Sequence, residues 1–266
     1  MSIVECKTDI GLIRENNEDA SLAMRHPKND NIILLLVADG MGGKEYGEVA
    51  SSFVCDRIKD WFLSKSPSFF LDLSLLEDEA ISLVEEANLD LISKFGKNVT
   101  GTTLSLAIVL EHFTFTLNVG DSRIYLYRRK KLIQVSEDAS DVWFYYKYGA
   151  VLKDDLRFFF HNNVITSCIG LDKEFCHIEV ELLENGYDIL LLVSDGVSDM
   201  ITDSKIKKII DSSPLDRILS NIIYEAVYVD QHFHIPFRLK RAKYSKYVLP
   251  FNGRDNATGA IYIKDS

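Results

Sequence analysis

Three apolar runs of the sequence each end in a short turn that carries an aspartate. Asp39 follows Leu-Leu-Leu-Val-Ala, Asp121 follows Thr-Leu-Asn-Val-Gly, and Asp195 follows Leu-Leu-Leu-Val-Ser. A fourth aspartate, Asp255, comes just before the last apolar run, and the acidic pair Glu18-Asp19 precedes an early one. Any one Asp-Gly pair is most simply a turn. The ends of strands in packed sheets converge on one rim, so together these carboxylates are expected to face one another.

Carboxylates that lie close together have raised pKa values unless cations lie among them. The predicted cluster offers oxygen ligands with no Cys or His nearby, and such ligands favour Mg²⁺ or Mn²⁺ over zinc. A glycine beside an aspartate, such as Gly40, lets backbone and water approach a metal closely. Two ions about 3.5–4 Å apart can hold a bridging water, lower its pKa and clamp a phosphoryl group. The residues therefore predict a dinuclear phosphohydrolase site.

One cation lies close to the acidic pair in the sequence. Arg14 could hold two phosphate oxygens with its planar guanidinium group. It could equally form a surface salt bridge with Glu15 or Glu18. The spacing alone does not separate these two roles.

Hydrophobic periodicity predicts the elements that must position these residues. Residues 2–8, 20–25 and 31–38 are predicted strands, and the third is apolar throughout, as in a strand buried on both faces. Apolar residues then recur at steps of three and four over 46–62 and again over 76–95. This spacing predicts two amphipathic helices.

The period then changes to that of strands. Leu104–Leu110, Phe113–Val119 and Ile124–Tyr127 are predicted strands, and their connections are so short that antiparallel neighbours are expected. Glu179–Leu183 and Ile189–Val193 are predicted to form another hairpin, turned at an Asn-Gly pair.

Helical patterns follow over 205–210 and 215–229, and a last strand is predicted over Ala257–Ile263. Antiparallel strands in two groups, with helix pairs between them, predict an α+β fold in which a central antiparallel β-sandwich is flanked by helix pairs. This order argues against a doubly wound nucleotide-binding sheet.

The composition narrows the class of protein. The 266 residues are 47% hydrophobic and 26% charged, as in ordinary soluble globular chains, and the net charge is −10. So acidic a chain is not expected to bind nucleic acid. The longest apolar run, Ile32–Ala38, is far shorter than the roughly 20 residues of a membrane helix. No membrane association, no secretory signal and a cytoplasmic location are therefore expected, with the four cysteines free.

Six motifs occur in one order between residues 14 and 258. They are Arg14-x-x-Asn17-Glu18-Asp19, Ala38-Asp39-Gly40-Met41-Gly42-Gly43, Gly101-Thr102-Thr103, Gly120-Asp121-Ser122-Arg123, Ser194-Asp195-Gly196 and Asp255-Asn256-Ala257-Thr258. This set resembles the metal-dependent protein Ser/Thr phosphatases, the PPM or type 2C family, and Asp-Gly-Met-Gly-Gly is similar to the bacterial branch. The resemblance implies a β-sandwich flanked by helix pairs, with a dinuclear Mn²⁺ or Mg²⁺ site at one end.

The resemblance also implies a role for each matching residue. Asp39 would bridge both ions, and the Gly40 carbonyl would bind one of them. Asp195 and Asp255 would ligate the other ion, and Glu18 would act through a bound water.

Further roles follow from the same resemblance. Arg14 would bind the substrate phosphate. Asp121 and Asp199, with Asp195, match positions that hold a third metal in bacterial members. Gly101-Thr102-Thr103 would start a core strand and have a structural role.

The sequence departs from the family at three positions. Met41 stands where animal members have a general-acid His, Lys44 replaces a usual His, and Asp138-Ala139-Ser140 replaces the usual Asp-His-Ser. None of these changes removes a metal ligand. The chain is therefore predicted to be an active phosphatase that hydrolyses phosphoserine and phosphothreonine in proteins.

Two other functions compete with this prediction. A catalytically silent relative that binds a phosphoprotein or another partner would usually lack the metal-binding aspartates, which are all present here. Hydrolysis of a small phosphoester on an unrelated metal fold does not explain the ordered motifs. Phosphoprotein substrates, an opposing Ser/Thr kinase and a monomeric chain are expected.

Two segments of the predicted single domain, residues 1–266, are unusual. A flap segment at about 137–165 carries eight aromatic residues between Trp143 and Phe160, which suit either a small local core or a surface that selects protein substrates. A basic insertion at about 231–254 has six Lys or Arg residues and no acidic one. It suits either a loop packed on an acidic face or a docking strip for an acidic or multiply phosphorylated substrate.

Overall fold

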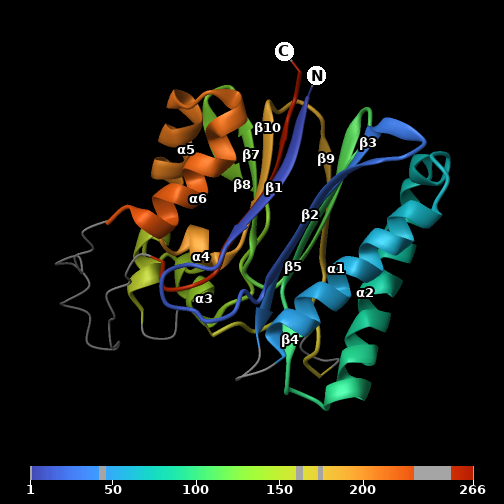
Figure 1. Ribbon diagram of the computed structural model, residues 1–266, viewed down its shortest axis with the longest axis horizontal. Helices are drawn as coiled ribbons and strands as arrows, with labels where there is room; N and C mark the ends of the chain where they lie inside the picture. The colour runs from blue at the N-terminus through green and yellow to red at the C-terminus, as the bar shows by residue number, and fades with distance from the viewer. Residues whose placement is uncertain (1, 42–45, 160–163, 173–175, 231–252, 266) are drawn as a thin grey trace.

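Two antiparallel sheets packed face to face form the centre of the molecule. Figure 1 shows the computed structural model, which describes residues 2–41, 46–159, 164–172, 176–230 and 253–265. Nearly all of the predicted basic insertion lies outside the described residues, as do Lys44 and Phe160. The described part of the chain has its first and last residues side by side at one end of the sandwich (Figure 1).

The first sheet contains five strands, and each pair of neighbours is antiparallel. In spatial order they are β1 (Ile3–Asp9), β11 (Ala257–Ile263), β10 (Ile189–Val193), β7 (Arg123–Arg128) and β8 (Lys131–Gln134). The N-terminal and C-terminal strands are therefore hydrogen-bonded to each other, in a register that pairs Ile3 with Ile263.

The second sheet is also antiparallel. Its strands are, in spatial order, β2 (Asp19–His26), β3 (Asn29–Met41), β5 (Leu104–Val109), β6 (Phe113–Val119) and β9 (Glu179–Glu184), with the short β4 (Gly101–Thr102) paired to the end of β3. Each predicted strand is confirmed, close to its expected bounds. β8 was not predicted, and Gly101-Thr102, which were expected to start the core strand β5, form the separate strand β4.

Two of the predicted pairings are wrong. β6 and β7 are not neighbours, because the turn Gly120-Asp121-Ser122 carries the chain from one sheet to the other. β9 and β10 do not form a hairpin either, since β9 pairs with β6 and β10 pairs with β7 and β11. Three residues can span about 10 Å, which is the separation of two packed sheets. A short connection therefore suits a crossing between sheets as well as a hairpin.

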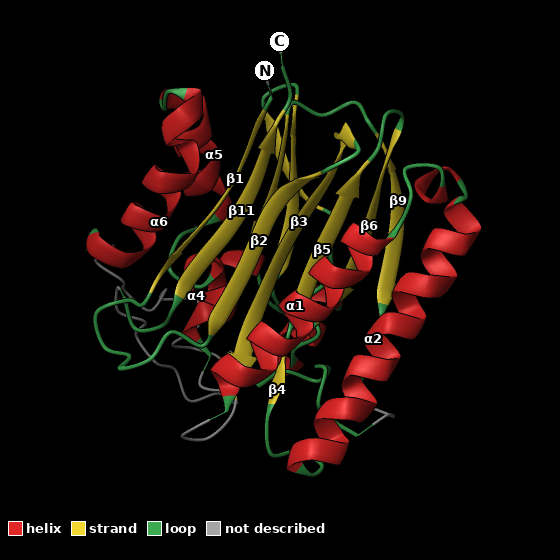
Figure 2. Ribbon diagram, turned by 45° about the vertical axis from the view of Figure 1, so that its right-hand side comes forward, coloured by secondary structure: helices red, strands yellow, loops and turns green. Residues whose placement is uncertain are grey.

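Helix pairs cover both outer faces of the sandwich (Figure 2). α1 (Gly47–Ser64) and α2 (Leu73–Phe95) lie on the second sheet, and α5 (Asp203–Ser212) and α6 (Ile218–Tyr228) lie on the first. These helices confirm the predicted helical segments and the predicted α+β class. None of the helices in the described ranges is both long and apolar enough to cross a membrane.

The apolar run of β3 shows how one strand serves two layers of the core. Ile33 and Leu35 pack between the two sheets, whereas Leu34 and Leu36 pack against α1 and α2. Side chains alternate across a strand, so a strand that is buried on both faces must be apolar at every position.

A third layer of the core lies between the first sheet and its helices. Leu191 of β10 and Ile261 of β11 are buried there together with Ile222 of α6. The sandwich therefore has one apolar layer at its centre and one under each helix pair.

The described part of the predicted flap segment contains a small buried core and an exposed aromatic surface. Its elements are the short helix α3 (Asp141–Lys147) and the 3₁₀ turn η2 (Lys153–Phe158). Val142, Trp143 and Leu156 form a small buried cluster, as expected for a local core. Phe144 and Tyr148 are instead 59% and 74% exposed, with ring centroids 4.3 Å apart. The aromatic residues therefore supply both a core and an exposed surface.

Candidate active site

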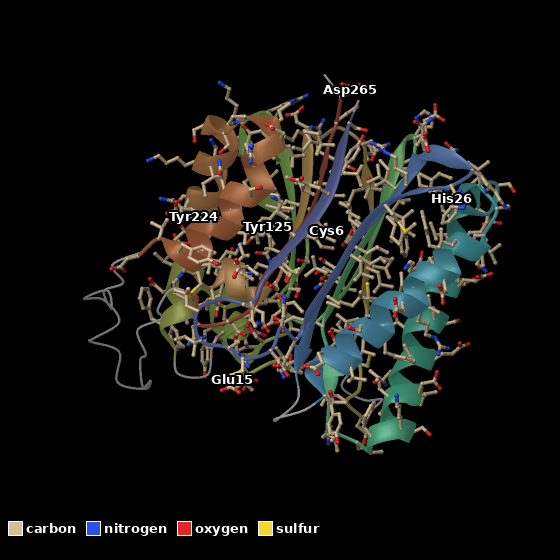
Figure 3. The ribbon with its side chains drawn as sticks, viewed as in Figure 1. Cys6, Glu15, His26, Tyr125, Tyr224 and Asp265 are labelled. Atoms are coloured by element: carbon tan, nitrogen blue, oxygen red, sulfur yellow. The ribbon has the colours of Figure 1, made fainter. Side chains whose placement is uncertain are left out.

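The ends of several strands meet at the lower end of the sandwich in Figure 1. The end of β3, the turn between β6 and β7, the four-residue helix α4 (Asp195–Ser198) and the start of β11 all lie there. Glu15, in the loop after β1, lies at this end, whereas His26 and Asp265 lie toward the opposite one (Figure 3). The rim on which the sequence analysis placed its carboxylates is therefore present.

Asp39 is held by its backbone at the end of β3. Its N–H donates to Thr103 Oγ1 at 3.0 Å, and its carbonyl accepts from the Thr103 N–H at 2.9 Å and from Thr102 Oγ1 at 3.0 Å. Thr103 Oγ1 also shares a 2.8 Å hydrogen bond with Ser122 in the turn beside Asp121. The structural role predicted for Gly101-Thr102-Thr103 is confirmed by these contacts.

Gly40 lies where no side chain fits. A Cβ atom there would stand 2.2 Å from the Gly47 carbonyl oxygen and 2.4 Å from that of Glu18. The Glu18 carbonyl also accepts hydrogen bonds from the Gly40 N–H, at 3.1 Å, and from Ser51 Oγ, at 2.6 Å. These close backbone contacts hold the end of β3, the start of β2 and the start of α1 together beside Asp39.

Four aspartates come together next to Gly40, where β2, β3 and α1 meet. Asp19 is paired with Asp39 across β2 and β3, and its carboxylate accepts a 2.9 Å hydrogen bond from Ser194 Oγ. The charge of Asp195 raises the pKa of Asp39, and the charge of Asp255 raises the pKa values of both. The structure therefore brings together Asp19, Asp39, Asp195 and Asp255, all of which the sequence analysis placed in the expected carboxylate cluster.

Burial dominates the titration of this cluster. It raises the pKa of Asp19 to about 8 and the pKa of Asp195 to about 7, with neighbouring carboxylates adding to both shifts. Burial and the charge of Asp19 raise the pKa of Asp39 well above its usual range. Asp195 Oδ1 is shielded from solvent and has no hydrogen-bond partner among the described residues. These are the properties of carboxylates that lack a compensating cation.

Arg14 lies on the exposed side of the cluster. Its guanidinium group donates to Asp255 Oδ2 at 2.7 Å and to Glu18 Oε2 at 3.3 Å. Partial burial raises the pKa of Glu18. The Arg14 side chain remains 43% exposed, so it is open to a ligand from solvent. Both roles considered from the sequence are compatible with this position, although the salt bridge also involves Asp255.

A small cavity adjoins the cluster. Asp121, Asp195 and Asp199 line it, and its volume of about 10 Å³ suits a single water or ion. Burial raises the pKa of Asp121 well above its usual range and also raises the pKa of Asp199, which Arg123 and Arg157 lower in part. The three residues predicted to hold a third metal therefore share one cavity.

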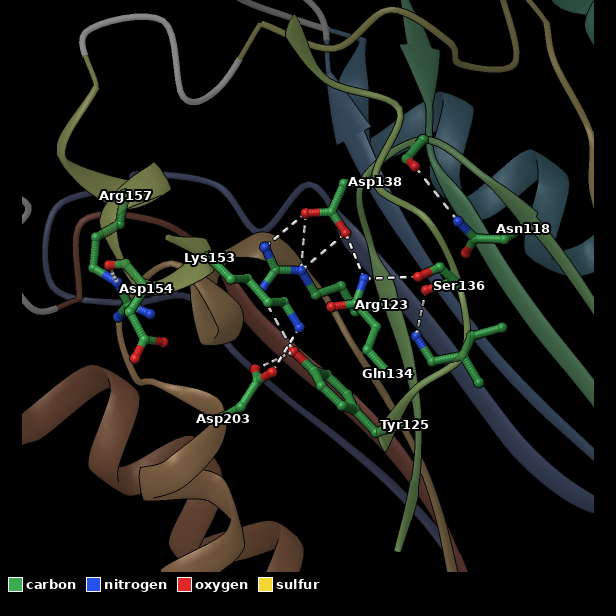
Figure 4. A network of polar contacts seen from close by, with 12 residues as sticks. Asn118, Arg123, Tyr125, Gln134, Ser136, Asp138, Lys153, Asp154, Arg157 and Asp203 are labelled. Atoms are coloured by element: carbon green, nitrogen blue, oxygen red, sulfur yellow. Dashed lines mark hydrogen bonds and ion pairs between the residues drawn. The ribbon is translucent and has the colours of Figure 1, made fainter. Parts of the chain in front are cut away.

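A buried ion pair lines part of this cavity. Figure 4 shows the pair and its polar neighbours. Arg123 Nε lies 3.0 Å from both carboxylate oxygens of Asp138, and Arg123 Nη2 lies 2.6 Å from Oδ2. Gln134 Nε2 donates to Asp138 Oδ1 at 2.7 Å. Asp138 thus has a structural partner in the segment where the sequence departs from the family's Asp-His-Ser.

The same network continues into the flap (Figure 4). Tyr125 Oη donates to Asp203 Oδ1 at 2.8 Å, and Lys153 Nζ, from η2, lies 2.6 Å from Asp203 Oδ2. Lys153 also stands over the rings of Tyr125 and Trp143, at 5.4 and 5.8 Å from their centroids. The flap is therefore tied to the first sheet and to the start of α5 by polar contacts.

The donor set fits hard divalent ions. It consists of carboxylate oxygens and the backbone at Gly40, and the raised pKa values and the unpartnered Asp195 oxygen indicate a need for positive charge. Within the described ranges, no three His, Cys, Asp or Glu side chains are already arranged around a single ion position. Asp255 is instead paired with Arg14. The individual ligand roles remain predictions.

Sequence reasoning missed the ion pair between Arg123 and Asp138, which lines the cavity. No sequence motif predicts the contact between Arg123 and Asp138, because it exists only where β7 and the segment after β8 lie together in the fold. Asp19 was expected in the carboxylate cluster, and the pairing of β2 with β3 places it opposite Asp39.

The fold and the acidic rim with its arginine define a class of protein. A double antiparallel sandwich between helix pairs, with buried aspartates at one end, is the architecture of the PPM phosphatases, as the sequence analysis expected. Residues 14–222 match the sequence model of the family described as Protein phosphatase 2C. The chain belongs to this family, which is metal-dependent, and it is a protein serine/threonine phosphatase.

Similar proteins agree with this assignment. The chain is 31% identical over 215 residues to "Serine/threonine phosphatase stp" of Listeria monocytogenes, covering 78% of this chain and 82% of that protein. The structure of Stp1 from Staphylococcus aureus has a TM-score of 0.81 and 27% identity, over 100% of this chain and 96% of that one. The catalytic domain of PstP in complex with two manganese ions shares the fold, with a TM-score of 0.75 and 22% identity over 98% and 97% of the two chains. The predicted family, fold class and enzyme are confirmed.

Proposed function

We propose that this phosphatase hydrolyses phosphoserine and phosphothreonine in proteins with a water activated between two Mn²⁺ or Mg²⁺ ions. One observation carries the proposal: Asp19, Asp39 and Asp195 are clustered with raised pKa values, and one Asp195 oxygen is buried without a partner among the described residues. A cluster of this kind is stabilised by cations bound among its oxygens. The two manganese ions named for PstP, which has the same fold, support the number and kind of ion.

The ligands follow from the predicted roles. Asp39 would bridge the two ions, the Gly40 carbonyl would bind one, and Asp195 and Asp255 would bind the other. Glu18 would act through a bound water. Asp121 and Asp199, with Asp195, would hold a third ion, for which the cavity of about 10 Å³ has room.

The protein residues prepare this site for a phosphorylated side chain. When bound, the ions would supply a water of lowered pKa and neutralise charge on the phosphoryl group. Arg14 would bind the phosphate oxygens, since its guanidinium group is partly exposed and directed by Asp255 and Glu18. The backbone of Asp39 is held in place by two threonines, Thr102 and Thr103. Met41 has no proton to donate, so the leaving oxygen would take its proton from water.

The wider context is also a proposal. Residues 1–266 would act as one monomeric phosphatase domain in the cytoplasm, on phosphoproteins made by an opposing Ser/Thr kinase. The exposed rings Phe144 and Tyr148 favour a role for the flap in choosing protein substrates.

Phosphate release from a phosphothreonine peptide tests the proposal. Wild type, Asp39→Asn and Asp60→Asn are compared with Mn²⁺, with Mg²⁺ and with excess chelator. Asp60 is an exposed residue of α1 and serves as the matched control. Turnover that requires metal, survives in Asp60→Asn and is lost in Asp39→Asn is expected. Turnover by Asp39→Asn equal to wild type, or turnover unaffected by chelator, would overturn the two-metal mechanism.

A further inference from the structure

One buried side chain beside the acidic cluster has no role in the mechanism above. Asn256 follows Asp255 at the start of β11 and is 2% exposed. Its amide reaches across to the loop between β1 and β2, which carries Arg14 and Glu18. Asn256 therefore connects two segments that are more than 200 residues apart in the chain.

Every hydrogen bond of this amide is directed at the loop backbone. Asn256 Oδ1 accepts from the Glu18 N–H at 2.8 Å. Asn256 Nδ2 donates to the carbonyl oxygens of Ile10 at 2.9 Å and Asn16 at 3.0 Å. These partners define the orientation of the amide, because an N–H can only donate and a carbonyl can only accept. The three bonds hold both ends of the loop.

The apolar side chains of the loop do not anchor it. Leu12 and Ile13, next to Arg14, are 56% and 60% exposed. The loop backbone is instead bonded to the segment before β11, where the Leu12 N–H donates to the Gly253 carbonyl at 2.7 Å. Gly11 lies in the left-handed region with φ of 80°, and a Cβ there would stand 2.4 Å from the Asp255 carbonyl oxygen. The loop is thus placed by polar backbone contacts, and Asn256 makes three of them.

We propose that Asn256 is a positioning residue that sets where Arg14 stands relative to Asp255 and so governs binding of the substrate phosphate. The inference rests on the proposed function, in which Arg14 binds that phosphate. The side-chain hydrogen bonds of Asn256 all go to the loop backbone. Asn256 acts by holding the backbone on both sides of Arg14, whose guanidinium group then reaches Asp255 at 2.7 Å.

Kinetics of Asn256→Ala test this role. Misplacing a group that binds the reacting phosphate lowers kcat/KM by about 10- to 100-fold. The loss is expected mainly as a higher KM for a phosphothreonine peptide and weaker inhibition by inorganic phosphate, at saturating Mn²⁺. Asn88→Ala is the matched control, because Asn88 is also 2% exposed and accepts a hydrogen bond from the Gly170 N–H at 2.6 Å, but on α2. An equal KM change in the two variants would overturn the proposal.

A double-mutant cycle separates positioning from general stability. If Asn256 acts through Arg14, adding Asn256→Ala to Arg14→Ala costs less than about twofold in kcat/KM. Independent, multiplying losses would instead show that Asn256 acts elsewhere. Should the alanine variant fail to fold, Asn256→Asp keeps the acceptor for the Glu18 N–H and loses both donors, and the same comparison applies.

Hydrogen exchange tests the positioning role of Asn256 without relying on catalytic activity, so the two proposals can fail separately. A wild-type protein without turnover in Mn²⁺ would overturn the two-metal proposal, but the loop contacts could still be measured. Asn256→Ala is expected to speed amide exchange at residues 11–18 while leaving exchange in β5 unchanged. Unchanged exchange at residues 11–18 would overturn the positioning role whatever the activity.

Discussion

Asp19 and Asp39 are direct neighbours across the antiparallel strands β2 and β3. Like charges in this arrangement destabilise a strand pair. Burial raises the pKa of both carboxyl groups, and the charge of Asp19 adds to the shift at Asp39. The protein therefore carries, at the centre of its site, a pair of residues that weakens the fold when ionised and no cation is bound.

The metal-free protein should lose stability as pH rises. The pKa values of Asp19 and Asp195 are about 8 and about 7 when folded, against an ordinary 3.8 when unfolded. A group with a raised folded pKa favours the folded state at low pH and loses that contribution as pH rises through the folded pKa. With chelator, the Tm is expected to fall from about pH 4 to about pH 8, the window between the ordinary pKa and the two folded pKa values.

Bound Mn²⁺ should reverse this trend, because it stabilises the ionised carboxylates. The gain in Tm on adding Mn²⁺ is expected to be larger at about pH 8 than at about pH 6, as measured by thermal unfolding at both values. Asp19→Asn removes one of the shifted groups and should flatten the pH dependence with chelator. A chelated protein whose Tm is constant over this range would contradict the prediction.

Gly40→Ala should destabilise the fold through backbone crowding. The added Cβ would stand 2.2 and 2.4 Å from the carbonyl oxygens of Gly47 and Glu18, and neither backbone atom can move without disturbing α1 or β2. A loss of about 3 kcal/mol in the free energy of unfolding is expected by urea denaturation. Gly186→Ala is the control, since its backbone is outside the left-handed region and its Cβ would meet only the end of the flexible Arg128 side chain, at 2.9 Å. Equal losses in the two variants would argue against crowding.

Much of the fold could be predicted because periodicity is a local property. The apolar run of β3 and the helical faces of α1 and α2 each follow from neighbouring residues, and the structure confirms them. The partners of β6 and β9 could not be predicted in the same way. The turn at Gly120 fits a hairpin and a crossing between sheets equally well, and the packing of the sandwich decides between them.

The same contrast applies to the site. Asp39, Asp195 and Asp255 could be found because each follows or precedes a strand end in a recognisable turn. The roles of Arg123 and Asp138 depend on a contact between β7 and the segment after β8, for which a spacing of 15 residues carries no signal. Buried ion pairs of this kind are visible only in the folded chain.

Breaking the buried pair should cost more than breaking an exposed one. The side chains of Arg123 and Asp138 are only 7% and 5% exposed, so Asp138→Ala leaves a guanidinium charge buried without its partner. A loss of about 3–5 kcal/mol is expected in urea denaturation. Glu137→Ala removes the exposed partner of Lys147 and should leave the stability unchanged. A small loss in Asp138→Ala would show that water or another group compensates Arg123.

The third-ion position can be separated from the other two by counting bound metal. Asp121 lines the cavity of about 10 Å³ with Asp195 and Asp199, but it does not take part in the proposed pair of ions. Asp121→Asn is therefore expected to lose the weakest Mn²⁺ site in a calorimetric titration and to keep the tighter sites. Asp255→Asn should instead weaken one of the tight sites, because Asp255 is a proposed ligand of the pair. Loss of the same site in both variants would mean that the cavity and the acidic cluster bind metal as one unit, and the proposed division of ligands between two ions and a third would be wrong.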